Sequence, residues 1–209
     1  MEKIVIVGDK AHFKIPNGGE NQLTYEIPPI STIVGILQNI YNKDINDFLV
    51  GYKIEYGSKE KEIIKIYKEV NINDNLKNPK RFISAKCYVE NLINVRLVIY
   101  TDIVDKIELN ECLTLGKAGY LANLNIKHSY DLIDKEGIAY NQYSPISMGD
   151  GKILRIKTLT KYNGLKGYYD YWSTLVRQND EVEYSKFYDE EEEENIIMWK
   201  WKDGEVSAV

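Results

Sequence analysis

The amino-acid sequence of 209 residues predicts an α+β fold. Residues 2–8 are apolar on both faces of an extended chain, which is typical of a central strand. Residues 30–41 repeat apolar side chains every three or four positions, which is typical of an amphipathic helix packed on a sheet. Further alternating runs indicate more strands. We expect residues 1–136 to form the main domain and residues 137–209 a small β-rich appendage.

A long loop, residues 9–27, is expected between the first strand and the helix. Loops of this length are uncommon unless they work as binding loops or are disordered. Gly18 and Gly19 interrupt regular structure there, and a plain turn is favoured over a phosphate-binding one. Pro28 and Pro29 then open the helix, because the missing N–H of proline would be unpaired in a first turn. The expected buried face of the helix consists of Ile30, Ile33, Val34, Leu37, Ile40 and Tyr41.

Shorter segments fill the chain beyond residue 50. The expected elements are a hairpin of residues 51–56 and 62–70, a strand of residues 81–89 paired with residues 94–100, a weaker helix of residues 102–112 and a strand of residues 125–133. Their order is that of a ferredoxin-like unit with inserted strands. In the appendage, residues 152–159 and 195–201 are strand-like.

The net charge of −5 is unevenly distributed along the chain. Residues 179–209 hold eleven acidic residues and three lysines, a net −8, so the preceding part carries +3. The most acidic run, residues 189–194, has three interpretations: a solvated loop, which is favoured, a tail, or a contact with a basic partner. The whole-chain charge therefore does not exclude a nucleic-acid partner.

Several classes of protein are disfavoured by what the sequence lacks. Cys87 and Cys112 have no CxxC spacing, so neither a zinc site nor a disulfide framework is indicated, and we expect no metal or cofactor. Walker A, GxSxG and HExxH motifs are absent from the sequence. Since no apolar run approaches the ~20 residues of a spanning helix, we expect a cytoplasmic protein without a membrane partner.

Two segments carry a family resemblance. Residues 11–16 read A-H-F-K-I-P and residues 24–41 read T-Y-E-I-P-P-I-S-T-I-V-G-I-L-Q-N-I-Y. Together they resemble the N-terminal signature of the CRISPR-associated protein 5 family. Residues 115–122, L-G-K-A-G-Y-L-A, are similar to a second motif of that family, with Lys117 where arginine is usual.

The resemblance implies a RAMP-type protein, with an RRM-related, ferredoxin-like N-terminal domain and a small C-terminal β domain. It implies an RNA-binding structural subunit of a type I, I-B-like Cascade surveillance complex in antiviral defence, rather than an enzyme. Such a subunit caps the 5′ handle of the crRNA and contacts the backbone and large subunits. It meets target DNA through the complex, in which base pairing reads the target.

The main candidate RNA-binding residues lie in the first motif or directly before it: Lys10, His12, Phe13, Lys14 and Tyr25. Aromatic planes stack on splayed RNA bases, and lysines neutralise phosphates. The alternative is an ordinary solvated loop with the Phe13 ring in the core. A more distant stretch, residues 152–172, also interleaves lysines with aromatic residues, but an ordinary strand and loop is favoured there.

The second motif adds Lys117 and Tyr120 to the candidate site. Two glycines beside Lys117 allow a backbone-amide nest for phosphate. A tight loop that packs Leu121 and Leu124 is the equally supported alternative.

Two further functions remain open. His128 with Lys127, or His12, would serve a metal-independent endoribonuclease that processes pre-crRNA, because histidine is the usual general acid or base. Two polar residues at a strand end is the favoured interpretation of Lys127 and His128. The third function is a protein–protein adaptor without direct RNA contact.

Overall fold

The computed structural model describes residues 1–15, 21–69, 83–105, 107–108, 112–145, 152–163, 166–177, 182–202 and 205–209. Side chains are described in these ranges except at residues 66–69, 83–85 and 152–184. The elements are β1 Glu2–Ala11, α1 Ile30–Tyr41, β2 Phe48–Glu55, β3 Ser58–Glu69, β4 Ile83–Thr101, β5 Ala122–Lys127, β6 Ile133–Ala139, β7 Tyr143–Pro145, β8 Lys152–Asn163, β9 Lys166–Arg177, β10 Val182–Asp189, β11 Glu194–Ile196, β12 Met198–Lys202 and β13 Glu205–Ala208.

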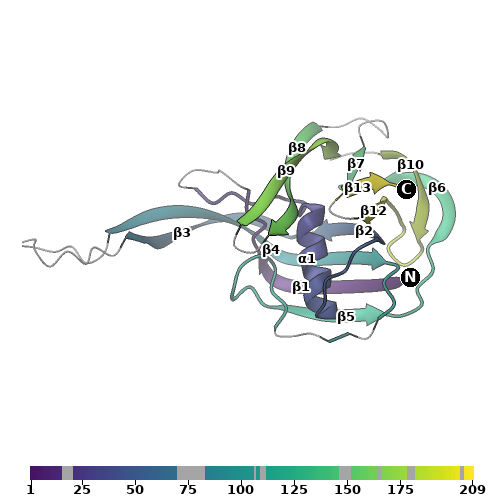
Figure 1. Cartoon of the computed structure of the whole chain (residues 1–209), viewed down its shortest axis with the longest axis horizontal. Helices are drawn as coiled ribbons and strands as arrows, with labels where there is room; N and C mark the ends of the chain where they lie inside the picture. Colours follow the sequence, from purple (N-terminus) through teal and green to yellow (C-terminus); the bar gives the residue numbers. More distant parts are fainter. Residues whose placement is uncertain are drawn as a thin grey trace, which may run out of the picture.

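The main sheet is antiparallel and has the strand order β13-β12-β2-β4-β1-β5, with β3 also paired to β4. α1 connects β1 to β2, and β4 lies between these two strands, which is the split β-α-β arrangement of a ferredoxin-like unit. The first strand and the helix are therefore confirmed, and Figure 1 shows α1 lying across the strands of the sheet.

The expected second helix is wrong for the residues that can be described. Residues 102–105 and 107–108 are irregular, and residues 106 and 109–111 lie outside the described residues. Apolar spacing at Ile103 and Ile107 instead lets both side chains pack against the main core without a helix. The described chain is thus mostly β with one helix rather than α+β in the balanced sense.

The expected hairpin of residues 51–56 and 62–70 is also wrong. β2 and β3 do not pair with each other; both pair with β4, β2 along residues 96–101 and β3 along residues 83–93. The two strands expected at residues 81–89 and 94–100 are one strand, β4, which passes through Asn94 at a positive φ of 54°. The β3–β4 ribbon extends away from the body of the molecule as an arm (Figure 1).

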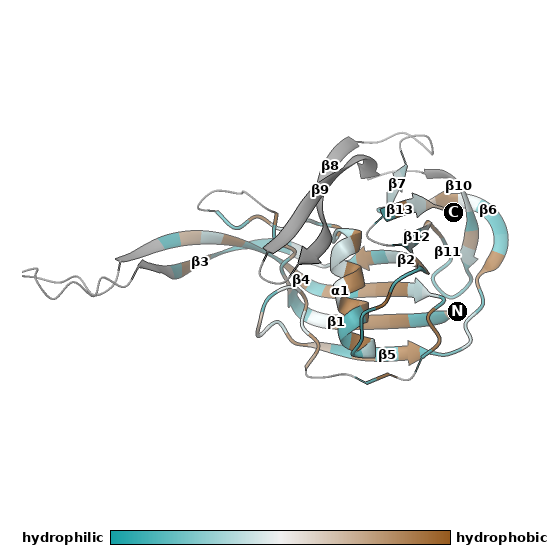
Figure 2. Cartoon of the chain, viewed as in Figure 1, coloured by the Kyte–Doolittle hydropathy of each residue, from teal (hydrophilic) through white to brown (hydrophobic). Residues whose placement is uncertain are grey.

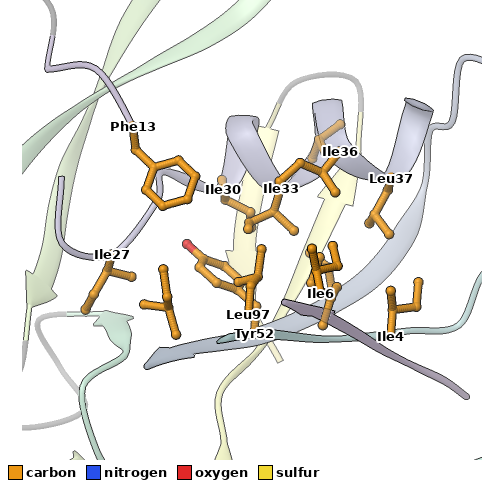
Figure 3. Close-up of a cluster of buried hydrophobic side chains, with 14 of the residues drawn as sticks. Ile4, Ile6, Phe13, Ile27, Ile30, Ile33, Ile36, Leu37, Tyr52 and Leu97 are labelled. Atoms are coloured by element: carbon orange, nitrogen blue, oxygen red, sulfur yellow. The ribbon is translucent and has the colours of Figure 1, made fainter. Parts of the chain in front are cut away.

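The main core lies between α1 and the main sheet, and a smaller buried cluster of Val98, Tyr100, Ile196 and Met198 lies on the other face of the sheet. Seven of the twelve residues of α1 are buried, and they pack on the even-numbered side chains of β1, Ile4 and Ile6, and on Leu97 and Ile99 of β4. Figure 3 shows several of these side chains meeting between helix and strands, and in Figure 2 α1 and the central strands carry long hydrophobic stretches. Each fully buried isoleucine or leucine contributes about 1.5–3 kcal/mol, so this layer holds the fold together.

The end of the chain belongs to the same sheet as its beginning. β12 pairs with β2, and the buried side chains of Trp199 and Trp201 join the main core. Gly51 of β2 lies so close to β12 that a Cβ there would overlap Met198 Sδ. The expected boundary between residues 136 and 137 falls inside β6, which forms a three-stranded sheet with β10 and β11; β7, β9 and β8 form another.

The acidic run at residues 189–194, called the acidic turn below, is the tip of the β10–β11 hairpin. Asp189 is fully buried, and the Glu192 and Glu194 side chains are largely buried against the main sheet. The preferred expectation of a solvated loop is therefore wrong for these three residues, because lysines and an arginine of the sheet face them. Glu190 and Glu193 are exposed, as expected.

Among the described residues, no helix is long and apolar enough to cross a membrane.

Candidate nucleic-acid interface

The two motif segments, far apart in sequence, meet in the structure. The backbone N–H of His12 donates a hydrogen bond to the carbonyl of Leu115 at 3.1 Å. Gly116 follows at a φ of +83°, and a Cβ at this position would overlap the carbonyl oxygen of His12. Glycine is therefore required here for both the backbone conformation and the close approach. We call the place where residues 10–14 and 115–120 meet the junction.

His12 is buried at the junction, with 3% of its surface exposed. Its Nδ1 lies 2.7 Å from the carbonyl oxygen of Glu90. Because a carbonyl only accepts, Nδ1 carries the proton and Nε2 is left as an acceptor. Nε2 is buried and has no hydrogen-bond partner among the described residues. Burial lowers the pKa of His12, and the positive charges of Lys117 and Lys14 lower it further, so the ring is neutral at pH 7.

Lys10, Lys117 and Tyr120 take part in a chain of contacts at the junction. Lys117 Nζ lies 5.9 Å from the centre of the Tyr120 ring, and the Tyr120 hydroxyl donates to Asn91 Oδ1 at 3.0 Å. Asn91 Nδ2 donates to Glu62 Oε2, which also receives a 3.4 Å contact from Lys10 Nζ. This chain of contacts connects Lys10 to Tyr120 across the base of the arm. The structure thus brings Lys10, His12, Lys14, Lys117 and Tyr120 together.

The two candidate aromatic residues of the first motif, Phe13 and Tyr25, lie differently from the cations. Phe13 is 2% exposed and packs in the core beside Ile30, as Figure 3 shows, so its ring is not on the surface for stacking. Tyr25 is half-buried, and its backbone N–H donates to the carbonyl of Phe13 at 2.8 Å. Thr24 Oγ1 accepts from the Phe13 N–H and holds the two chain segments together. For Phe13 the structure matches the alternative interpretation, a ring in the core.

Glu90 contacts the junction and is a residue that the sequence analysis missed. Its carboxylate is buried; Oε2 lies 3.2 Å from Lys59 Nζ and accepts from the Thr24 N–H at 3.4 Å. Its carbonyl holds His12. The available signal was a charged residue in the middle of an apolar strand, since such a side chain is rarely buried without a partner.

The residues considered for catalysis do not gather in one place. His128 is 66% exposed and its Nδ1 lies 2.6 Å from Glu2 Oε2, while Lys127 Nζ contacts Glu191 at 2.6 Å. Lys127 pairs with Lys3 at the start of β1, whereas His12 lies beyond the end of that strand. Nine residues of extended chain span about 30 Å, so the two histidines cannot act on one phosphate.

Some expectations fall outside the described residues. Gly18 and Gly19 belong to residues 16–20, and the side chains of residues 152–172, with their lysines and aromatic rings, are likewise outside them. Within the described residues, no group of three or more His, Cys, Asp or Glu side chains could hold a metal ion.

Comparison with solved structures identifies proteins of the same fold. One is a chain in the cryo-EM structure of the Type III-B Cmr-beta bound to cognate target RNA and AMPPnP: 13% identity, TM-score 0.56, covering 87% of this chain and 86% of that chain. Another is a chain of a CRISPR RNA-guided surveillance complex: 11% identity, TM-score 0.53, covering 88% and 91%. Protein-family models and curated proteins give no match. At such identities the likeness establishes the fold alone, and it is consistent with a RAMP-type fold.

Proposed function

We propose that this chain is an RNA-binding structural subunit of a CRISPR RNA-guided surveillance complex. Both structural neighbours come from assemblies of this kind, and they share the fold along most of both chains. The sequence resemblance to the CRISPR-associated protein 5 family points the same way independently of the structural likeness. A type I, I-B-like Cascade is the assembly that the resemblance favours.

The observation that carries the proposal is the junction. Two motifs separated by about a hundred residues bring Lys14 and Lys117 close enough to the buried His12 for their charges to lower its pKa. Lysines bind phosphates as mobile point charges, and the half-buried Tyr120 ring beside Lys117 suits contact with a base. RNA offers phosphate, ribose and base together, so the junction fits a short single-stranded segment.

Within the complex the chain caps the 5′ handle of the crRNA and bridges the backbone subunit to the large subunit. Target DNA is met only through the assembled complex, where the guide reads it by base pairing. RNA affinity should decrease with added salt, because each phosphate bound by a lysine releases counterions.

A handle-bearing RNA tests the assignment in a filter-binding or fluorescence-anisotropy assay. A Lys10/Lys14/Lys117 triple alanine variant should lose about a hundredfold in affinity, because three phosphate contacts are removed. The matched control is a Lys135/Lys186/Lys202 triple alanine, which removes the same charge from exposed positions on β6, β10 and β12. Equal binding by both triple variants would exclude the junction as the RNA site.

The proposed role is structural rather than catalytic. What supports this is the burial of His12, which leaves it poorly placed to exchange protons with a substrate, and the pairing of Lys127 and His128 with Glu191 and Glu2. Incubation of labelled repeat RNA with the protein in EDTA tests it: the RNA should remain intact. Specific cleavage that disappears in His128→Ala would establish the endoribonuclease alternative, and a complex that purifies without RNA would favour the adaptor.

A further inference from the structure

Four cationic side chains share the face of the main sheet opposite α1. Side chains alternate along a strand, and Lys3 is out of phase with the core residues Ile4 and Ile6. Lys127 is the cross-strand neighbour of Lys3. Arg96 pairs with Val7 and Lys53 with Val98, and these belong to the same out-of-phase set. We call Lys3, Lys53, Arg96 and Lys127 the cationic face.

The acidic turn supplies a carboxylate to every member of the cationic face. Lys3 Nζ lies 2.7 Å from Asp189, 3.0 Å from Glu191 and 3.1 Å from Glu192. Lys53 Nζ lies 2.8 Å from Glu194 and 3.3 Å from Glu192, and Lys127 Nζ lies 2.6 Å from Glu191. Both terminal nitrogens of Arg96 donate hydrogen bonds to the Glu192 carboxylate, at 2.6 and 2.7 Å.

One residue of the turn, Asp189, fixes the position of the others. Its carboxylate accepts hydrogen bonds from the hydroxyls of Tyr100 and Tyr130, both at 2.5 Å. It also accepts hydrogen bonds from the backbone N–H groups of Glu191 and Glu192. The turn is therefore held in one conformation on the sheet, and the carboxylates of Glu191, Glu192 and Glu194 are aimed at the cations.

The contacts of the turn have the chemistry of contacts to an RNA backbone. Arginine forms the same bidentate pair with a phosphate as with a carboxylate. An open antiparallel sheet face is also the surface that RRM-type domains use for single-stranded RNA. Beyond the turn this face continues with exposed side chains, Val7 at 47% and Asn123 and Asn125 from β5. These offer apolar contact and amide hydrogen bonds of the kind that bases use.

We propose that the cationic face is a latent binding face for single-stranded RNA and that the acidic turn closes it as an internal competitor. RNA is thereby confined to the junction, at the opposite end of β1. The inference rests on the proposed RNA-binding function for its biological purpose, but its test does not depend on RNA binding at the junction.

The test compares two variants with the same change in charge. Glu191→Gln/Glu192→Gln removes carboxylates that contact the cationic face. Glu190→Gln/Glu193→Gln removes two carboxylates of the same turn. The side chains of these two residues are exposed and make no ion pair with the described residues. Anisotropy with labelled oligouridylate should show about tenfold tighter binding for the first variant than for the second, because charge-assisted contacts become available to phosphate.

Three additional measurements make the result decisive. The gain should persist when Lys10, Lys14 and Lys117 are alanine, and it should disappear when Arg96→Ala is added. Footprinting by lysine acetylation should show that RNA protects Lys127 only in the opened variant. If the double variant unfolds at a lower temperature than the wild type, the comparison is repeated with the single variants Glu191→Gln and Glu190→Gln, which change exposed residues. Their affinities for oligouridylate should then differ by about threefold.

Equal affinities of the two glutamine variants, measured on folded protein, would overturn the proposal. A wild-type chain that does not bind handle RNA, together with a gain in the opened variant, would overturn the proposed function and leave the latent face supported. The two failures are therefore distinguishable.

Discussion

Lys3 Nζ lies 2.7 Å from Asp189 Oδ2, and neither side chain reaches solvent. One residue belongs to the first strand and the other to the tip of the β10–β11 hairpin, so the pair joins the two ends of the chain. A buried pair stabilises a fold only when its geometry and remaining hydrogen bonds are complete, as they are here. Its main effect is to fix where the hairpin sits.

Asp189→Asn should lower the free energy of unfolding by about 3 kcal/mol, because a buried lysine loses its closest carboxylate. Urea denaturation measures this change. Glu190→Gln, one position along the turn and exposed, should stay within about 0.5 kcal/mol of the wild type. The combination Lys3→Met/Asp189→Asn should cost less than the sum of the single variants, since no unpaired charge remains. Additive costs would contradict the pair's coupling.

Acid should destabilise the protein through the same turn. Burial by itself would raise the pKa of Asp189, but hydrogen bonds from Lys3, Tyr100 and Tyr130 hold it below its usual 3.8. The Arg96 guanidinium holds the pKa of Glu192 well below 4.5. A carboxylate whose pKa is lowered by folding stabilises above its unfolded pKa and loses that contribution as the pH falls.

The free energy of unfolding contributed by these carboxylates should therefore be constant above about pH 5 and fall below about pH 4. Urea midpoints measured across this range should show a shallower acid limb for Glu192→Gln than for the wild type. An unchanged limb in that variant would mean that other carboxylates dominate acid unfolding.

From His12 we expect a separate, milder pH dependence of the free energy of unfolding, between neutral pH and pH 5. Burial lowers its pKa from 6.5, so the unfolded chain binds a proton that the folded chain refuses. The stabilisation is present above about pH 6.5 and is lost as the pH falls. His12→Gln should remove this segment of the curve, and chemical-shift titration of the ring by NMR locates the folded pKa directly.

Local patterns in the sequence predicted β1 and α1 correctly because the core spacing of one strand or one helix is contained within that element. Which strands pair is decided by contacts between distant residues, so β2 and β3 gave no local sign that both lie against β4. The prediction of a solvated loop at the acidic turn was wrong for the same reason. Its run of charges suggested solvent, and only the fold reveals the cations at Lys3 and Arg96.

At the junction, sequence motifs identified the correct neighbourhood but not the orientation of each side chain. His12 and Phe13 are adjacent in a segment that the sequence predicts to be a loop, yet both side chains are buried. The carbonyls of Glu90 and Leu115, which accept hydrogen bonds from the His12 ring and backbone N–H, hold this segment in place, and both lie far along the chain. An earlier clue was available in Lys3, Lys53 and Arg96, three charges inside apolar strands, which call for partners.

Gly116→Ala should damage the junction far more than Gly119→Ala. Both glycines have positive φ, 83° and 90°, so alanine is strained at either site by about 1 kcal/mol. Only at Gly116 does the new Cβ overlap the His12 carbonyl, whereas no atom of the described residues lies within 4 Å of a Cβ at Gly119. We expect about 3 kcal/mol lost for Gly116→Ala, with RNA affinity reduced in parallel. Equal stabilities in urea would contradict the close approach.

Residues 1–136 should not fold without the remainder of the chain. This fragment lacks β12, which pairs with β2, and it lacks the core side chains of Trp199 and Trp201. Exposed strand edges and apolar surface lead to aggregation, so we expect insoluble protein on expression.

A protease site inserted beside exposed Asn141 in the full chain provides the matched control. After cleavage the two pieces should co-elute in size-exclusion chromatography and separate only in denaturant, because the last strands remain in the main sheet. Folded pieces that separate without denaturant would instead establish two independent domains.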